Sequence, residues 1–409
     1  MPVSSRLGLA PGPDRVFFVL ALGVLSAVSP MATDMYLASM PAMADFYGTP
    51  ASTIQLSLSA YMIGMAVGQF LLGPVSDMWG RHRLLVAGTS VFLLSSIGIV
   101  FSADVGLLLA LRVVQGFAGA AGVVISRAIV ADIAQGIEAA KMYSLLGTII
   151  SVAPIVAPVL GGLIATWAPW QAVFWVLTGF GALMVACVVF VIPETLPPER
   201  RRQGGIAGTL SLAGAVLANR PFMAWALAIS LSFGSLFSYI SASSFVMQNV
   251  VGLSSIGYSI VFATAAFGSV VSSLVNVRLL NRFSPTRIII AALGVQGIVN
   301  ALGLTGILLG APAWTIVVHV VCSQACVGFL MGNGIALSQA QVPGRAGSGS
   351  AVQGLLQFLV AAAVSPLAGL GGEHTAAPMG VLMFGFTTAA LLTALLAARW
   401  SRRSRPHES

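Results

Sequence analysis

Three ionisable side chains lie inside long apolar stretches of the sequence: Asp34, Arg112 and Arg127. A charge within hydrocarbon costs at least ~2.5 kcal/mol, so such a residue is a functional candidate by default. Asp34 is the only embedded acid, and its carboxyl group can bind and release a proton as its surroundings change. Arg127 lies close to a helix end with Asp132 near by, where a charged side chain reaches water easily and a structural role is favoured.

Asp34 and Arg112 are predicted to lie at the same depth, because each is about 9–10 Å from the outer end of its apolar stretch. If the two side chains move relative to each other between two states of the protein, the carboxyl group of Asp34 binds one proton in one state and releases it in the other. The sequence therefore predicts proton coupling through Asp34 and Arg112. The alternative is a static, structural ion pair.

The amino-acid composition indicates the medium that surrounds these residues. Only 30 of the 409 residues are Lys, Arg, Asp or Glu, which is 7%, whereas soluble domains carry about 25%. Hydrophobic residues make up 57%, and the mean hydropathy is +0.97, so most of the surface faces lipid. This excludes a soluble enzyme. It also excludes a nucleic-acid partner, because the net charge of +8 comes from loop arginines and not from one basic face.

The elements that position the charges are twelve apolar stretches, each long enough to span ~30 Å of hydrocarbon as a helix. They lack the period-2 alternation of barrel strands, so an all-α integral membrane fold is predicted. The first stretch is too long for a signal peptide and predicts an uncleaved helix. The stretches lie near residues 17–40, 52–75, 84–102, 105–132, 139–166, 170–192, 222–247, 255–281, 286–310, 313–341, 346–371 and 376–400.

Charge in the loops predicts the orientation. Seventeen of the nineteen Lys and Arg residues fall on the side of the N-terminus, whereas the opposite loops hold only Asp45, Asp104 and Glu373. By the positive-inside rule, both termini are predicted to be cytoplasmic.

The longest polar stretch predicts two halves of six helices each. It divides the chain into an N-terminal half (1–192), a central cytoplasmic linker (193–221) and a C-terminal half (222–409). Weak similarity between residues 157–162 and residues 365–369 supports an internal duplication. Two six-helix halves around a central pathway are typical of a rocking secondary transporter.

Three motifs carry a family resemblance. Residues 73–83 read GPVSDMWGRHR, which resembles the Gly-x-x-x-Asp-x-x-Gly-Arg-x-Arg signature of the major facilitator superfamily. Arg112 and Gly116 match its Arg-x-x-x-Gly element, and residues 157–162 are similar to its antiporter signature, with Ala157 in place of a glycine. The resemblance implies a conformational gate at Gly73, Asp77, Gly80, Arg81, Arg83, Pro154, Pro158, Gly161 and Gly162.

Two of these gate elements leave alternatives open. Asp77 is predicted to latch onto the first turn of the eleventh helix, around residues 348–350, or only to cap its own loop with Arg81. The prolines and glycines of the fifth stretch either bend that helix or let it pack tightly against a neighbour.

Further stretches resemble the Bcr/CflA subfamily of drug:proton antiporters, namely residues 33–37, 239–246 and 347–357. The resemblance implies a proton-coupled antiporter that exports small lipophilic drugs or antibiotics, amphenicol-like or bicyclomycin-like. It implies a monomer in the cytoplasmic (inner) membrane of a bacterium, with the lipid bilayer and a drug as partners and with no cofactor or metal besides the coupling proton. Ser26 replaces an acid that some multidrug members carry.

Aromatic and polar positions predict a substrate pocket that includes Tyr36, Tyr61, Gln115, Tyr239, Phe245 and Asn333. His319 is predicted at the depth of Arg112 in the other half, either as a second titrating group or as a histidine satisfied within its helix packing.

Three other functions compete with drug export. An exporter of an endogenous metabolite, such as a sugar or amino-acid derivative, uses the same fold and is the alternative. A membrane-embedded enzyme requires clustered His, Cys or acidic groups, but the four histidines lie in four separate regions, and no enzymatic activity is predicted. A passive channel is disfavoured, because no ring of repeated polar residues is present.

Overall fold

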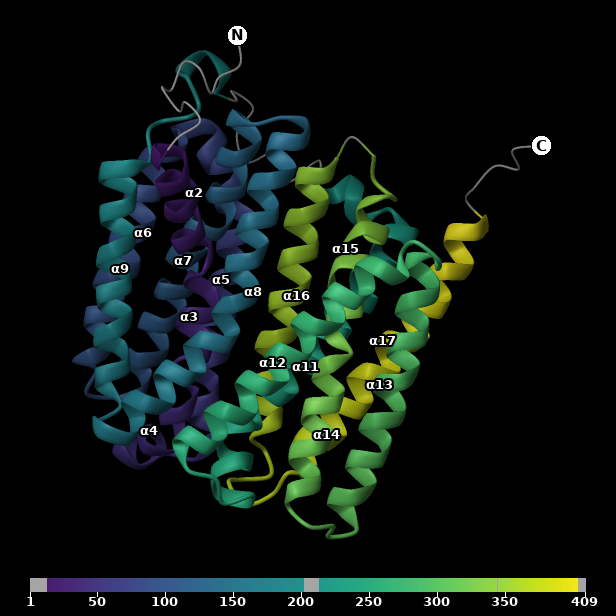
Figure 1. The fold of residues 1–409 in the computed structure, drawn as a ribbon. Coiled ribbons are helices and arrows are strands. Elements are labelled where there is room, and N and C mark those ends of the chain that lie inside the picture. The colour runs from purple at the N-terminus through teal and green to yellow at the C-terminus, as the bar shows by residue number, and fades with distance from the viewer. Residues whose placement is uncertain (1–12, 202–212, 344, 404–409) are drawn as a thin grey trace. The chain divides into compact units, whose positions relative to one another are not determined.

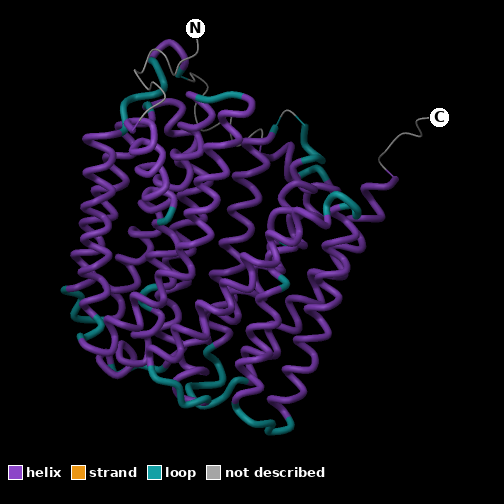
Figure 2. The backbone as a smooth tube through the Cα atoms, viewed as in Figure 1, coloured by secondary structure: helices purple, strands orange, loops and turns teal. Residues whose placement is uncertain are grey.

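The computed structural model describes residues 13–201, 213–343 and 345–403, and every regular element in them is a helix (Figure 2). Twelve helical segments within these residues are long and apolar enough to cross a membrane, which confirms the predicted all-α membrane fold. Residues 202–212 of the predicted linker lie outside the described part of the chain.

The chain forms two compact units. Unit 1 takes its described residues from Met1–Leu37 and Ala60–Thr209, and unit 2 takes them from Ala38–Ser59 and Leu210–Ser409. The segment Ala38–Ser59 thus packs with residues that are distant in the sequence, and α5 (Ala51–Trp79) contributes to both units.

Unit 1 is a bundle in which α6 lies against both α7 and α9 (Figure 1). Besides part of α5, the helices of this unit are α2 (Pro13–Ser26), α3 (Val28–Asp34), α6 (Arg81–Val100), α7 (Val105–Ile133), α8 (Gly136–Trp167), α9 (Gln171–Val191) and the short η2 (Pro198–Arg200).

Glycines allow α5 and α7 to touch along their backbones. A Cβ atom on Gly64 would overlap the backbone of Val113, and one on Gly116 would overlap the carbonyl of Tyr61. Small residues at such positions permit close helix packing in membranes. The close approach brings the side chains of the two helices into one buried layer.

The first span is interrupted, unlike the single helix that the sequence predicts. It consists of α2, α3, a short turn η1 (Leu37–Ser39) and α4 (Met40–Tyr47). Pro41 sits in the first turn of α4, where a missing backbone N–H costs nothing, so a new helix begins there. Asp34 is the last residue of α3 and therefore lies at an interruption inside the apolar span.

Unit 2 is built around α11, which packs against α15, α16 and α17 (Figure 1). Its core includes the buried side chains of Trp225, Ile229, Leu293 and Leu330. The helices are α4, α11 (Arg220–Phe245), the π-helical turn η3 (Val246–Val250), α12 (Ser255–Leu279), α13 (Pro285–Leu308), α14 (Trp314–Ala325), η4 (Val327–Phe329), α15 (Met331–Gln339), α16 (Ala346–Ala368) and α17 (Ala377–Arg403).

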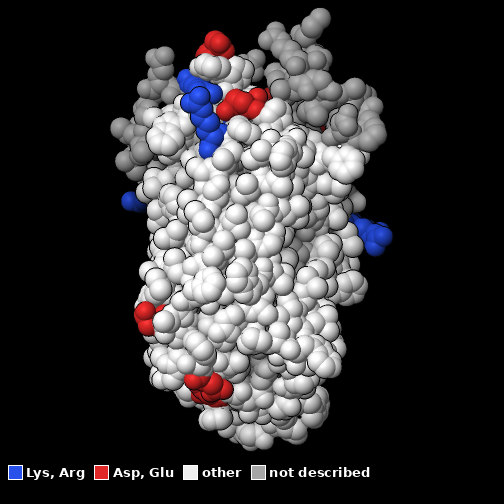
Figure 3. All heavy atoms as spheres, turned by 90° about the vertical axis from the view of Figure 1, so that its left-hand side faces the viewer, with Lys and Arg blue, Asp and Glu red and all other residues white. Residues whose placement is uncertain are grey.

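The surface agrees with a lipid environment. Large apolar side chains such as Leu94, Phe190 and Leu302 are 65%, 84% and 69% exposed. In the face that Figure 3 displays, most of the surface is uncharged, and the acidic and basic side chains are few and scattered. A continuous apolar surface of this size requires lipid to cover it.

Candidate functional site

The most unusual feature of unit 1 is a fully buried guanidinium group. Arg112 of α7 is 0% exposed. Its Nη1 donates hydrogen bonds to the backbone oxygen of Ala32 at 3.1 Å and to Oε1 of Gln115 at 2.6 Å. Ala32 is close to the C-terminal end of α3, where backbone carbonyls carry partial negative charge that a cation stabilises. Arg112 therefore fastens α7 to the interrupted first span.

Two tyrosine rings complete the surroundings of Arg112. The guanidinium carbon lies 4.5 Å from the ring centre of Tyr36 and 4.6 Å from that of Tyr61, and both rings are fully buried. Cation–π contacts of this kind contribute about 2 kcal/mol when they are desolvated. Gly116, one turn after Arg112, lets α7 approach α5 closely enough for the contact with Tyr61.

Asp34 lies two residues after Ala32 and is 4% exposed. Its Oδ1 accepts a hydrogen bond from the Thr33 hydroxyl at 2.8 Å. A Cβ atom on Gly161 would overlap the backbone of Met35, so α8 packs directly against the interruption that follows Asp34. The carboxyl group of Asp34 is therefore buried at a point where α8 and the interrupted first span meet.

The structure thus brings four predicted residues of unit 1 into direct contact: Tyr36, Tyr61, Arg112 and Gln115. Asp34 lies two residues after Ala32, whose backbone oxygen accepts a hydrogen bond from Arg112. Sequence reasoning missed Ser96 of α6, which accepts a hydrogen bond from Gln115 Nε2 at 2.8 Å. Serine is common within membrane helices, so nothing in the sequence distinguishes Ser96 from its neighbours.

The other predicted pocket residues belong to unit 2. Tyr239 of α11 is buried and stacks on Phe262 of α12 with 5.4 Å between the ring centres. Phe245 is the buried last residue of α11. Asn333 of α15 pairs with Asn276 of α12, to which its Nδ2 donates at 2.8 Å. These three residues lie at separate helix contacts and do not form one hydrogen-bonded cluster with each other.

His319 belongs to a buried polar network in unit 2. Its Nε2 lies 3.0 Å from Oδ1 of Asn300, whose Nδ2 donates to Thr387 Oγ1 at 2.9 Å. Because the oxygen of that amide can only accept, His319 Nε2 acts as the donor. A Cβ atom on Gly303 would overlap the imidazole ring, so α13 packs directly on it.

This packing favours a structural role for His319, and a prediction follows from it. We expect His319→Gln, which keeps a hydrogen-bond donor for Asn300, to transport with an unchanged pH profile. His319→Ala leaves the amide oxygen of Asn300 buried without its donor, which costs about 1–3 kcal/mol of unfolding free energy. Transport across a pH series and thermal unfolding of both variants test this. A shifted pH profile in His319→Gln would make His319 a titrating group.

Two residues of the predicted gate, Asp77 and Arg81, belong to a second cluster, which is polar. Arg81, the first residue of α6, is 6% exposed. Its Nη1 lies 2.6 Å from an Asp77 carboxylate oxygen and also contacts the Ser76 hydroxyl, while its Nε donates to Asp132 Oδ2 at 3.0 Å. Arg83 is exposed, and Gly73 lies inside α5 against Val124. The predicted latch between Asp77 and the eleventh helix stays a prediction.

Two acids of this cluster were missed as partners of Arg81. Besides Asp132, Glu194 accepts hydrogen bonds from the backbone N–H groups of Arg81 at 2.9 Å and Leu196 at 3.0 Å. Glu194 Oε2 also lies 3.6 Å from Arg201 Nη2. The sequence contained a signal for these contacts. Asp77, Asp132 and Glu194 end the second, fourth and sixth spans, and they are therefore predicted on one side of the membrane.

Gly80 directly precedes Arg81 and lies against Glu194. Its φ of +98° is a conformation that side chains rarely adopt, and a Cβ atom there would meet the carboxylate of Glu194. We expect Gly80→Ala to lower the free energy of unfolding by about 1–3 kcal/mol. Gly147→Ala is the matched control, because Gly147 is helical with nothing within 4 Å of an added Cβ. Equal melting temperatures for the two variants in detergent would contradict this expectation.

The predicted residues of the fifth stretch all lie within α8. Pro154 and Pro158 are inside the helix, and Gly161 and Gly162 are buried. Gly161 makes the close contact with Met35 described above, which corresponds to tight packing of α8 against the first span.

Residues 22–366 match the Major Facilitator Superfamily, and the chain belongs to this family. The members are transporters rather than enzymes, and this chain is a multi-pass membrane protein. Its resemblance to the drug:proton antiporter subfamily is confirmed by the names of its relatives.

Three relatives align along most of their length. The uncharacterized MFS-type transporter YdgK of Bacillus subtilis is 36% identical over 91% of this chain and 93% of the relative. The bicyclomycin resistance protein homolog of Haemophilus influenzae is 30% identical, with 88% and 91% covered. The multidrug resistance protein MdtL of Klebsiella pneumoniae is 31% identical, with 83% and 85% covered.

Solved structures share the fold. A bacterial homolog of the human lysosomal transporter Spinster, in an inward-facing and unoccupied conformation, superposes with a TM-score of 0.74. The match covers 98% of this chain and 100% of that structure at 17% sequence identity, and so supports the fold alone.

Proposed function

We propose that this protein exports small, uncharged, lipophilic compounds of the bicyclomycin or amphenicol type in exchange for protons. The observation that carries the proposal is the buried Arg112 of unit 1, which contacts two tyrosine rings and donates to Ala32, two residues before the buried Asp34. This region combines a group that can carry a proton with aromatic surfaces that suit an apolar ligand. The resistance proteins among the relatives supply the class of compound.

Arg112 has a definite role in this proposal. It is a planar cation, and its hydrogen bond to Ala32 holds the segment that carries Asp34. An ionised Asp34 is attracted to the positive charge of Arg112. A protonated Asp34 is neutral and loses that attraction. The two protonation states therefore stabilise different arrangements of the first span, and drug and proton compete for this region.

The driving force is sufficient for such an exchange. With a membrane potential of order 150 mV, one inward proton supplies ~3.4 kcal/mol. This supports roughly a 300-fold gradient of a neutral drug. A neutral substrate also agrees with apolar spans that hold few fixed charges, since a buried unpaired ion would be costly.

The proposal places the protein in the bacterial cytoplasmic membrane. Twelve spans return the chain to the side on which it started, and most of the basic loop residues are on that side. The positive-inside rule then makes both termini cytoplasmic.

Drug accumulation in cells that express the protein tests the function. We expect labelled chloramphenicol or bicyclomycin to accumulate less in these cells than in cells with an empty vector, and a protonophore to remove the difference. A difference that persists after the proton gradient collapses would contradict proton coupling. An unchanged accumulation of both drugs, with export of an endogenous metabolite, would favour the alternative function.

A further inference from the structure

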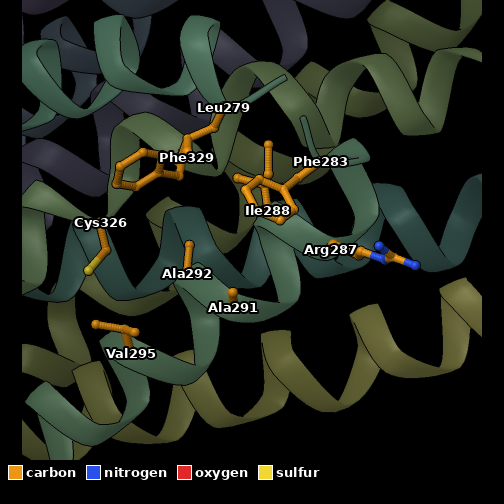
Figure 4. A pocket seen from close by; sticks show the side chains of 9 residues that line it. All are labelled: Leu279, Phe283, Arg287, Ile288, Ala291, Ala292, Val295, Cys326 and Phe329. Atoms are coloured by element: carbon orange, nitrogen blue, oxygen red, sulfur yellow. The ribbon is translucent and has the colours of Figure 1, made fainter. Parts of the chain in front are cut away.

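Unit 2 contains an apolar groove that the transport mechanism does not use. It has a volume of about 500 Å³ and is formed by the end of α12, the first half of α13 and the region of η4. Figure 4 shows Leu279, Phe283, Ile288, Val295 and Phe329 around it.

One side chain that lines the groove is charged. Arg287 lies in the first turn of α13, and its guanidinium group extends away from the apolar side chains (Figure 4). Val295 lies eight residues further along α13, so the groove runs about 12 Å from the charged end into the apolar span. A ligand that fits must therefore combine a long apolar part with an anionic end.

Two further arginines directly precede residues that line this end of the groove: Arg278 precedes Leu279, and Arg282 precedes Phe283. Arg278 occupies the last turn of α12, and Arg282 lies in the turn that leads to α13. Both are exposed, as is Arg287. The start of α13 adds the partial positive charge of its free N–H groups.

Among the described residues of unit 2, no carboxylate lies on the same side of the membrane as these arginines. The sequence contains no Asp or Glu between Glu199 and Glu373. The turn between α12 and α13 follows the eighth span, whereas Asp45 ends the first span and Glu373 follows the eleventh. Alternation of the spans therefore places both of these acids at the opposite face, and no other acid belongs to the described residues of unit 2.

We propose that this groove binds an anionic phospholipid, with one acyl chain along α13 and the phosphate on Arg287, Arg278 and Arg282. The bilayer that surrounds the protein supplies such a lipid at high concentration. Juxtamembrane Lys and Arg residues attract anionic lipid by about 1 kcal/mol each, which is about fivefold in affinity. The apolar walls of the groove favour an acyl chain, and the three arginines favour a negatively charged headgroup.

Native mass spectrometry of the detergent-purified protein tests the proposal. Titration with phosphatidylglycerol, phosphatidylcholine and glycerol phosphate separates the contribution of the headgroup charge to binding from that of the acyl chains. We expect phosphatidylglycerol to bind more than tenfold more tightly than phosphatidylcholine, and glycerol phosphate to bind too weakly for detection. Equal binding of the two lipids, or tight binding of glycerol phosphate, would overturn the proposal.

Matched variants locate the site. Arg287→Gln should weaken phosphatidylglycerol binding about fivefold, whereas Arg220→Gln, at an exposed arginine of unit 2 outside the groove, should not. Ala291→Phe should fill the groove and weaken the binding of both lipids. Leu302→Phe adds a ring about 16 Å further along α13 and serves as its control. Equal effects of a variant and its control would show that the lipid binds elsewhere.

Discussion

Cells that express Asp34→Asn are expected to lose all export against a concentration gradient. The substitution keeps the size of the side chain and a partner for the Thr33 hydroxyl, but it removes the group that exchanges a proton. A drug gradient can then only equilibrate, so the roughly 300-fold driving force disappears. Drug binding should survive and become independent of pH. In the wild type, binding should strengthen as pH rises, because an ionised Asp34 favours drug over proton.

The matched control for this variant is Asp45→Asn, which makes the same chemical change at an exposed position on α4. Its transport should equal that of the wild type. The measurement is drug uptake into inverted membrane vesicles that have an imposed pH gradient. An Asp34→Asn protein that still builds a gradient sensitive to a protonophore would show that the proton travels elsewhere.

Arg112→Lys is expected to reduce transport almost as much as Arg112→Ala. Lysine keeps the charge, but it has no planar group to lie against Tyr36 and Tyr61 while also bonding to Ala32 and Gln115. The alanine variant also leaves buried acceptors unpaired and a cavity, so its free energy of unfolding should fall by about 2–5 kcal/mol.

Transport rates and melting temperatures of purified protein check this expectation. Arg127→Lys is the control, because Arg127 is exposed, and a lysine at this position also places its charge in water. Full transport by Arg112→Lys would mean that only the charge matters and that the geometry around the guanidinium group does not.

The fold was predictable because the lipid environment leaves few options. Twelve apolar stretches with hardly any charge must be helices, since every backbone polar group has to be satisfied within its own segment. The interruption of the first span at Asp34 was not predicted, because the apolar stretch is long enough for one continuous helix, although Pro30 and Pro41 flank the interruption and signal a break. The packing of α8 on this interruption depends on Gly161, whose partner Met35 is distant in the sequence.

The candidate site was predictable in its charges but not in its contacts. Asp34 and Arg112 were recognisable because embedded charges are costly and therefore rare. That Arg112 bonds to the backbone of Ala32 follows from tertiary packing, which no local pattern encodes. The same holds for Arg81 and Asp132, since their contact joins the ends of two spans about fifty residues apart.

Proton release on drug binding tests the central claim most directly. Purified protein in a weakly buffered solution, near the pH at which Asp34 is half protonated, is mixed with drug while a pH indicator is monitored. If drug and proton compete for the region of Asp34, the wild type should release up to about one proton for each drug molecule bound. Asp34→Asn should bind drug and release none. Release of the same number of protons by both proteins, or binding by the wild type with no release at any pH, would contradict the account.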